Sequence, residues 1–167
     1  QAFDQARSLL AACEPIAGTP NALKRDFTFS GQEWRLVATV YGDAACTARF
    51  ASVAIAGTYT VGPASATVPA ATEAEFTFAS RVVTPEVQAA VDVLDGGSCG
   101  AGPRSVGTPV DVSATGCAPL GIPSVAQCSV EHDLLKLDGD RLFLGDRSGN
   151  LCANRPSAVA TTALRRP

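Results

Sequence analysis

Apolar and polar side chains alternate along most of this chain, and that period of two restricts its fold more than any other feature. Eight segments show the pattern: residues 22–30, 34–41, 50–61, 73–82, 109–115, 127–137, 141–145 and 157–164. Alternation places the apolar side chains of a strand on one face and the polar side chains on the other. Strands of this kind pair in antiparallel sheets that bury one face. The sequence therefore predicts a mainly β protein.

Short turn sequences connect several of these segments. Ser30–Gln32 predicts a hairpin between the first two strands, and Asp138–Asp140 predicts another near the end of the chain. Residues 65–70 predict a further short strand that Pro69 interrupts. Most neighbouring strands are thus expected to be antiparallel partners.

The period changes once, after residue 83. Val87, Val91 and Leu94 recur at helical spacing, Thr84 can act as an N-cap and Pro85 suits a first helical turn. We expect one helix over residues 84–95. Strands, one helix and then further strands predict a closed or half-open antiparallel β-barrel, lipocalin-like in shape. We expect a single barrel domain over residues 1–167.

Cysteine content predicts how this domain is held together. The six cysteines form no C-x-x-C pair and are spread along the chain, at Cys13, Cys46, Cys99, Cys117, Cys128 and Cys152. An even number at such spacing indicates disulfides and an oxidising compartment, so we expect a secreted protein, extracellular or periplasmic. Connectivity is open; we favour Cys99 with Cys117, Cys13 with Cys46, and Cys128 with Cys152.

Composition excludes some partners. Hydrophobic residues make up 46% of the chain and charged residues 17%, so the chain is expected to fold. A net charge of -3 offers no basic stripe for nucleic acid. No apolar run approaches the roughly 20 residues that cross a membrane, so no transmembrane segment is predicted. A homo-oligomer or an extracellular partner stays open.

Catalytic residues are not apparent. The only histidine, His132, lies between Glu131 and Asp133 on a predicted strand, where its neighbours point to the opposite face and cannot orient it. Glu73 and Glu75 share one strand face, which a solvated surface explains. We therefore expect no catalytic site and no enzymatic activity.

Metal and phosphate sites are also not predicted. Asp138, Asp140, Asp146 and Asn150 lie near the second hairpin but not in the order of an EF-hand, and a turn needs such residues. The glycines of residues 96–103 lack phosphate-cradle spacing. No metal ligands are expected.

Large apolar side chains on the predicted strands are the candidate ligand-binding residues: Phe27, Phe29, Trp34, Leu36, Phe50, Tyr59, Phe76, Phe78 and Phe143. They either fill the barrel or line a pocket for a small apolar ligand. Small residues such as Ala38, Ala54 and Ala56 leave volume unfilled if they point inward. The residues themselves leave both alternatives open.

Motifs in a fixed order cover most of the chain. They are CEPIAGTPNALKRDFTF at Cys13–Phe29, VYGDAACTARF at Val40–Phe50, AGTYTV at Ala56–Val61, ATEAEFTF at Ala71–Phe78, GCAPLG at Gly116–Gly121, EHDLLKLDGDRLFLGDR at Glu131–Arg147, and Arg155 with Pro156. In this order they resemble the adenomatosis polyposis coli down-regulated family, extracellular barrel modules whose vertebrate founder inhibits Wnt signalling.

The resemblance implies a half-open antiparallel barrel with a hydrophobic pocket implicated in holding lipid. A bound lipid or polyene pigment is the only cofactor-like molecule it suggests, and the ligand classes are a fatty acyl chain, a sterol or isoprenoid, and a carotenoid-like polyene. The alternative is an extracellular structural or recognition module that acts through its surface. This chain carries one such domain instead of two and no predicted anchor, so the Wnt-inhibiting role is not transferred.

Overall fold

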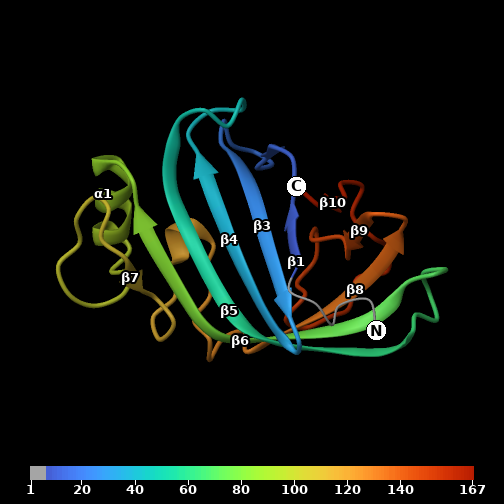
Figure 1. Cartoon of the computed structure of the whole chain (residues 1–167). Coiled ribbons are helices and arrows are strands. Elements are labelled where there is room, and N and C mark those ends of the chain that lie inside the picture. The colour runs from blue at the N-terminus through green and yellow to red at the C-terminus, as the bar shows by residue number, and fades with distance from the viewer. Residues whose placement is uncertain (1–6) are drawn as a thin grey trace.

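Figure 1 shows the computed structural model of the chain, which describes residues 7–167. Its strands are β1 (Arg7–Leu10), β2 (Glu14–Pro15), β3 (Ala22–Ser30), β4 (Glu33–Tyr41), β5 (Arg49–Ala64), β6 (Thr72–Pro85), β7 (Val110–Asp111), β8 (Val130–Asp138), β9 (Arg141–Leu144) and β10 (Leu164–Arg165). Its helices are α1 (Gln88–Gly96) and the short 3-10 helix η1 (Ala118–Leu120).

Antiparallel pairing closes eight of the described strands into a barrel. Strands β3 to β6 pair in sequence, β8 follows beside β6, and β9 and β10 continue the sheet. The ring closes at β1, which pairs with β10 on one side and with β3 on the other. The predicted antiparallel barrel with one helix is therefore confirmed, in its closed form.

A bulge keeps one face of the long strand β6 turned inward over its whole length. Gly57 pairs with Phe78 and Ala56 with Ser80, so Ala79 is an extra residue in β6. A Cβ on Gly57 would lie 1.7 Å from the carbonyl oxygen of Thr77, so only glycine fits this close approach. Beyond the bulge the buried positions change from even to odd numbers, and the inner face stays continuous.

This inner face carries two apolar cores. The barrel core lies inside the ring and contains Leu9, Ala11, Phe27, Phe29, Trp34, Tyr59, Ala74, Phe76, Phe78, Cys128, Leu135, Leu142, Leu144 and Leu164. The helix core lies where α1 covers the far ends of β5 and β6, and contains Ala51, Val53, Val83, Ala90, Leu94, Cys99, Val110, Val112 and Cys117. Partly buried Ile55 contacts both cores.

Three disulfides join segments that lie outside the strands. Cys13 pairs with Cys46, Cys99 with Cys117, and Cys128 with Cys152, which are the favoured pairings. The first ties the segment after β1 to the β4–β5 turn. The second ties the loop after α1 to η1. The third ties the segment before β8 to the loop after β9.

The predicted helix start is wrong by about one turn. Thr84 pairs with Ser52 and Pro85 with Ala51, so β6 continues through the expected cap. Proline is tolerated there because it is the last residue of the strand. The amide of Glu86 still donates to the carbonyl of Phe50, and α1 begins only at Gln88. Strand pairing outweighs a local capping signal.

Other predicted strands are shorter or missing. Residues 65–70 form a turn in which Ser65 Oγ accepts the amides of Thr67 and Val68, so the predicted strand is wrong there. Segment 109–115 shortens to β7, and 157–164 contributes one bridge at Val159 before β10. Strand β1 was not predicted, because residues 7–10 show no alternation.

Candidate ligand-binding site

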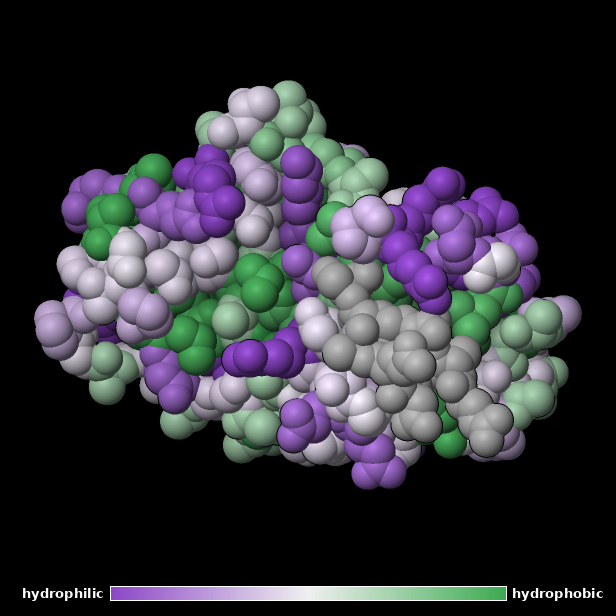
Figure 2. All heavy atoms as spheres, in the orientation of Figure 1, coloured by the Kyte–Doolittle hydropathy of each residue, from purple (hydrophilic) through white to green (hydrophobic). Residues whose placement is uncertain are grey.

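A partly open cavity of 130 Å³ lies at the edge of the barrel core. Its apolar lining consists of Phe27, Trp34, Leu36, Ile55, Phe76 and Phe78, and its polar lining of Arg25, Glu131 and Arg147. We call it the interior pocket. Figure 2 shows that hydrophobic residues also reach the surface near the centre of one face of the molecule, where hydrophilic residues border them.

Interlocked aromatic rings form the inner wall of this pocket. The Trp34 ring meets Phe76 and Phe78 edge-on, at centroid distances of 5.2 and 5.4 Å, and Phe29 meets Tyr59 at 5.3 Å. Trp34 Nε1 donates to the carbonyl oxygen of Thr77 at 3.1 Å, which satisfies the indole in an otherwise apolar setting. The wall is therefore preformed.

Five of the nine candidate residues line the interior pocket: Phe27, Trp34, Leu36, Phe76 and Phe78. Phe29 and Tyr59 lie behind them as fully packed members of the barrel core. Sequence reasoning did not identify Ile55 or the polar lining. An inward Arg25 was visible in the alternation, since it shares the parity of Phe27 in β3.

Two candidates are not brought to the pocket. Phe50 packs against the helix core. Phe143 lies between the inward Leu142 and Leu144 on β9, so strand alternation turns it outward, where the guanidinium carbon of Arg141 lies 5.6 Å from its ring centroid. Neither ring lines the interior pocket.

The alanines do not leave unfilled volume inside the barrel, contrary to the prediction. Ala38 faces inward, opposite Val53, and packs on the helix core. Ala54 and Ala56 instead line a separate cavity of 330 Å³ on the outer face, together with Asp26 and Arg35. They leave no volume inside the barrel.

A network of charged side chains borders the pocket. Arg147 contacts Glu131 at 3.0 Å and Asp133 at 2.7 Å. Asp133 is fully buried and also accepts the amides of Leu134 and Gly145. Burial raises the pKa of the Asp133 carboxyl, while Arg147 and both amides act in the opposite direction. Arg147 is thereby fixed at the pocket edge.

On the other side of the lining, Arg25 forms a bidentate pair with Glu14, with both distances 3.1 Å. The Arg25 guanidinium carbon lies 5.9 Å from the Phe27 ring centroid. Both side chains of the ion pair are largely buried. An ion pair held this way is a fixed polar edge to an apolar pocket.

His132 lies on the outer face, away from the interior pocket. Its Nδ1 is 3.1 Å from Glu75 Oε1, because the two residues are partners across β6 and β8. Glu131 and Asp133 point to the opposite face, as expected. The carboxylate that contacts His132 is that of Glu75 on the neighbouring strand β6. Arg155 reaches Glu73 and Glu75 at 3.4 and 3.7 Å, so these groups form a surface ion-pair network.

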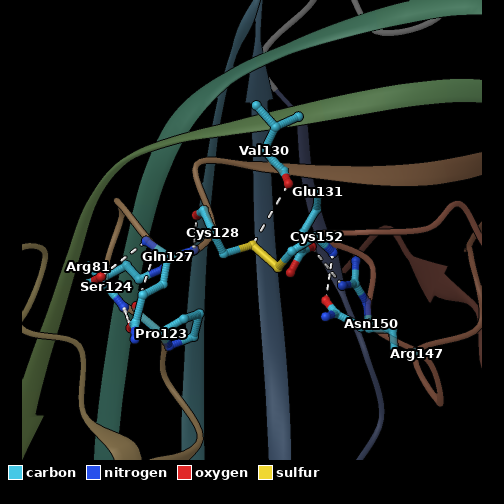
Figure 3. The surroundings of a disulfide bond; sticks show 10 residues. All are labelled: Arg81, Pro123, Ser124, Gln127, Cys128, Val130, Glu131, Arg147, Asn150 and Cys152. Carbon is cyan, nitrogen blue, oxygen red and sulfur yellow. Dashed lines mark hydrogen bonds and ion pairs between the residues drawn. A yellow bond between two sulfur atoms is a disulfide. The ribbon is translucent and has the colours of Figure 1, made fainter.

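One group of side chains has metal-like spacing. Potential ligand atoms of Cys128, Glu131 and Cys152 lie within 4.8 Å of one another. Figure 3 shows that both sulfurs are joined in the disulfide, so neither supplies the thiolate that a metal needs. Asp146 and Asn150 instead accept the amides of Ser148 and Cys152 and hold their own turns.

By its fold and its candidate site, this protein is a closed antiparallel β-barrel with an apolar pocket at the edge of its core. The family profile described as adenomatosis polyposis coli down-regulated 1 matches residues 8–107, from β1 to the loop after α1. The chain therefore belongs to that family. A comparison with curated proteins finds no match. All six apolar lining residues fall inside the matched segment, whereas Glu131 and Arg147 fall outside it.

No helix among residues 7–167 has the length and apolar character that a membrane crossing requires. The three disulfides are consistent with an extracellular protein.

Proposed function

We propose that this protein binds, without chemical conversion, an apolar small molecule whose end enters the interior pocket. The observation that carries the proposal is a 130 Å³ cavity walled by six apolar side chains, inside the family-matched segment. Buried aromatic and aliphatic surface with few polar groups is typical of a ligand site. We further propose that binding takes place outside the cell, where three disulfides persist.

The size of the cavity restricts the ligand. Engineered apolar cavities of about 150 Å³ stay dry and take up benzene. The interior pocket is of that order, so it suits the end of an acyl, isoprenoid or polyene chain better than a four-ring sterol nucleus. Each square ångström of apolar ligand surface removed from water contributes about 25 cal/mol, so a chain end can be held without an ionic anchor.

The only tryptophan of the chain reports on this site, because Trp34 lines it. We expect 1-dodecanol to change Trp34 emission saturably. Leu36→Gln puts a polar group in the lining and is expected to weaken binding about tenfold. Val37→Gln is the matched control. Val37 follows Leu36 in the same strand but points to the outer face, where its side chain is 45% exposed.

A flat titration, or equal losses in both variants, contradicts the proposal. Thermal unfolding of each variant verifies that the barrel is intact. Solvent extraction of the purified protein followed by mass spectrometry and an absorbance spectrum then identifies the class of any ligand carried from the source, including a pigment.

A further inference from the structure

A second cavity, of 610 Å³, shares two of its lining residues with the interior pocket. Glu131 and Arg147 border both spaces. The remaining lining includes Ile122, Gln127, Asn150 and the Cys128–Cys152 disulfide. We call this second space the disulfide groove; Figure 3 shows the disulfide with Glu131, Arg147 and Asn150 around it. The family profile ends at residue 107, so it does not cover the groove.

The size of the interior pocket gives the groove a role. Small-molecule sites generally measure about 300–1,000 Å³. At 130 Å³ the interior pocket holds only part of such a ligand. A ligand that extends from the pocket toward the groove lies next to the shared Glu131–Arg147 pair. The Arg147 side chain is 34% exposed and that of Glu131 is 23% exposed, so both can contact a ligand.

Charges around the groove are balanced. Arg147 is paired with Glu131 and Asp133. Buried Arg81 donates to the carbonyls of two lining residues, Pro123 and Cys128, at 3.1 and 2.9 Å. The groove itself is therefore lined by one guanidinium and one carboxylate, those of Arg147 and Glu131. A ligand carboxylate would have to compete with Glu131 and Asp133 for Arg147, and a ligand cation would meet the Arg147 guanidinium.

Neutral hydrogen-bonding groups complete the lining. Gln127 Oε1 accepts the amide of Ser124 at 2.9 Å, and Asn150 Oδ1 accepts the amide of Cys152 at 3.0 Å. Both contacts use the amide oxygen, which leaves each NH₂ group as a donor for a ligand. Glu131 adds an acceptor. A group that both donates and accepts, such as a hydroxyl, matches this set.

We propose that the disulfide groove binds the neutral, hydroxyl-bearing head group of an amphiphile whose chain end occupies the interior pocket. This inference rests on the proposed function. It predicts that the protein discriminates among ligands of equal chain length by their polar ends, and that it prefers a glycerol ester to the corresponding fatty acid.

The test compares three probes below their micelle concentrations, followed by Trp34 emission: 1-dodecanol, dodecanoate and 1-monododecanoylglycerol. We expect the glycerol ester to bind about tenfold more tightly than dodecanoate. Equal or tighter binding of dodecanoate overturns the head-group assignment. Failure of 1-dodecanol to bind overturns the proposed function itself, so the two failures are distinguishable.

Variants locate the head group. Gln127→Ala combined with Asn150→Ser removes both amide donors, while the introduced serine hydroxyl can still accept the Cys152 amide. We expect a loss of about tenfold for the glycerol ester and no change for methyl dodecanoate, a neutral ester of the same chain length that carries no hydroxyl. Gln32→Ala, at an exposed turn outside both cavities, is the control. An unchanged ester affinity in the double variant contradicts the proposal.

Glu131→Gln tests the competition for Arg147 directly. It keeps the shape of the side chain but removes one carboxylate partner, so dodecanoate is expected to bind about threefold to tenfold more tightly. The affinity for the glycerol ester should stay within about twofold. A variant in which dodecanoate gains nothing contradicts the assigned role of this ion pair.

Discussion

The two ends of the barrel lumen use the same kinds of residue to opposite effect. At the closed end, Phe29 and Tyr59 are buried, meet edge to face and leave the lumen filled. At the pocket end, Leu36 and Ile55 are only partly buried beside charged side chains. The closed end stabilises the fold, and the pocket end retains apolar surface that a ligand can cover. The comparison shows that an aromatic lining alone does not specify a binding site.

Truncating one side chain at each end should give the largest difference in stability between the two ends. Phe29→Ala should lower the free energy of unfolding by about 3–5 kcal/mol, because it empties a packed site with no exposure. Leu36→Ala should cost only about 1 kcal/mol, because part of the side chain is already in contact with water. Urea unfolding measures both. Similar losses would mean that both ends are equally packed.

The bulge that links the two ends is the next most sensitive point. Gly57→Ala should cost about 3 kcal/mol, because the added Cβ meets the Thr77 carbonyl and the pairing of β5 with β6 must shift. Gly62→Ala lies on the same strand and serves as the control, because the nearest atom would lie 3.5 Å from its added Cβ. Thermal unfolding of the two variants should differ clearly; equal midpoints would remove the special role of Gly57.

Smaller losses of stability are expected at the charged border of the pocket, where a buried and a partly exposed carboxylate can be compared. Asp133→Ala should cost about 2–3 kcal/mol, because it leaves two backbone amides and Arg147 without their buried acceptor. Glu131→Ala should cost less than about 1 kcal/mol, because Glu131 and Arg147 both reach water. Chemical denaturation distinguishes the two; a larger loss for Glu131 contradicts the assignment.

The smallest effect is expected at the helix-core end of the sheet. Arg49 lowers the pKa of Glu86 by hydrogen bonding to its carboxylate. The folded pKa therefore lies below the unfolded value, and the stabilisation is present above the unfolded pKa and lost as pH falls through the folded one. Because Arg49 is 54% exposed, it amounts to less than about 1 kcal/mol. Glu86→Gln should flatten the pH dependence of unfolding between about pH 5 and 3.

Sequence reasoning recovered the parts of the site that one strand decides. Alternation placed Phe27, Trp34 and Phe76 on buried faces, because a strand turns successive side chains to opposite sides whatever it pairs with. Alternation did not give the direction of Phe143. Leucines precede and follow this residue in β9, so both faces of the strand carry large apolar side chains and size does not show which face is buried. His132 shows the same limit, because its partner Glu75 lies 57 residues away in sequence.

The class of fold and the positions of the long strands follow from the sequence alone, whereas the cysteine pairing stayed open until the structure gave it. Only the tertiary structure decided that residues 7–10 close the ring, that the bulge at Ala79 redirects β6, and that Glu131 and Arg147 border two cavities at once. The physical reason is the range of the forces involved. Side-chain alternation acts within one strand, whereas closure, register and cavity depend on contacts between residues far apart along the chain.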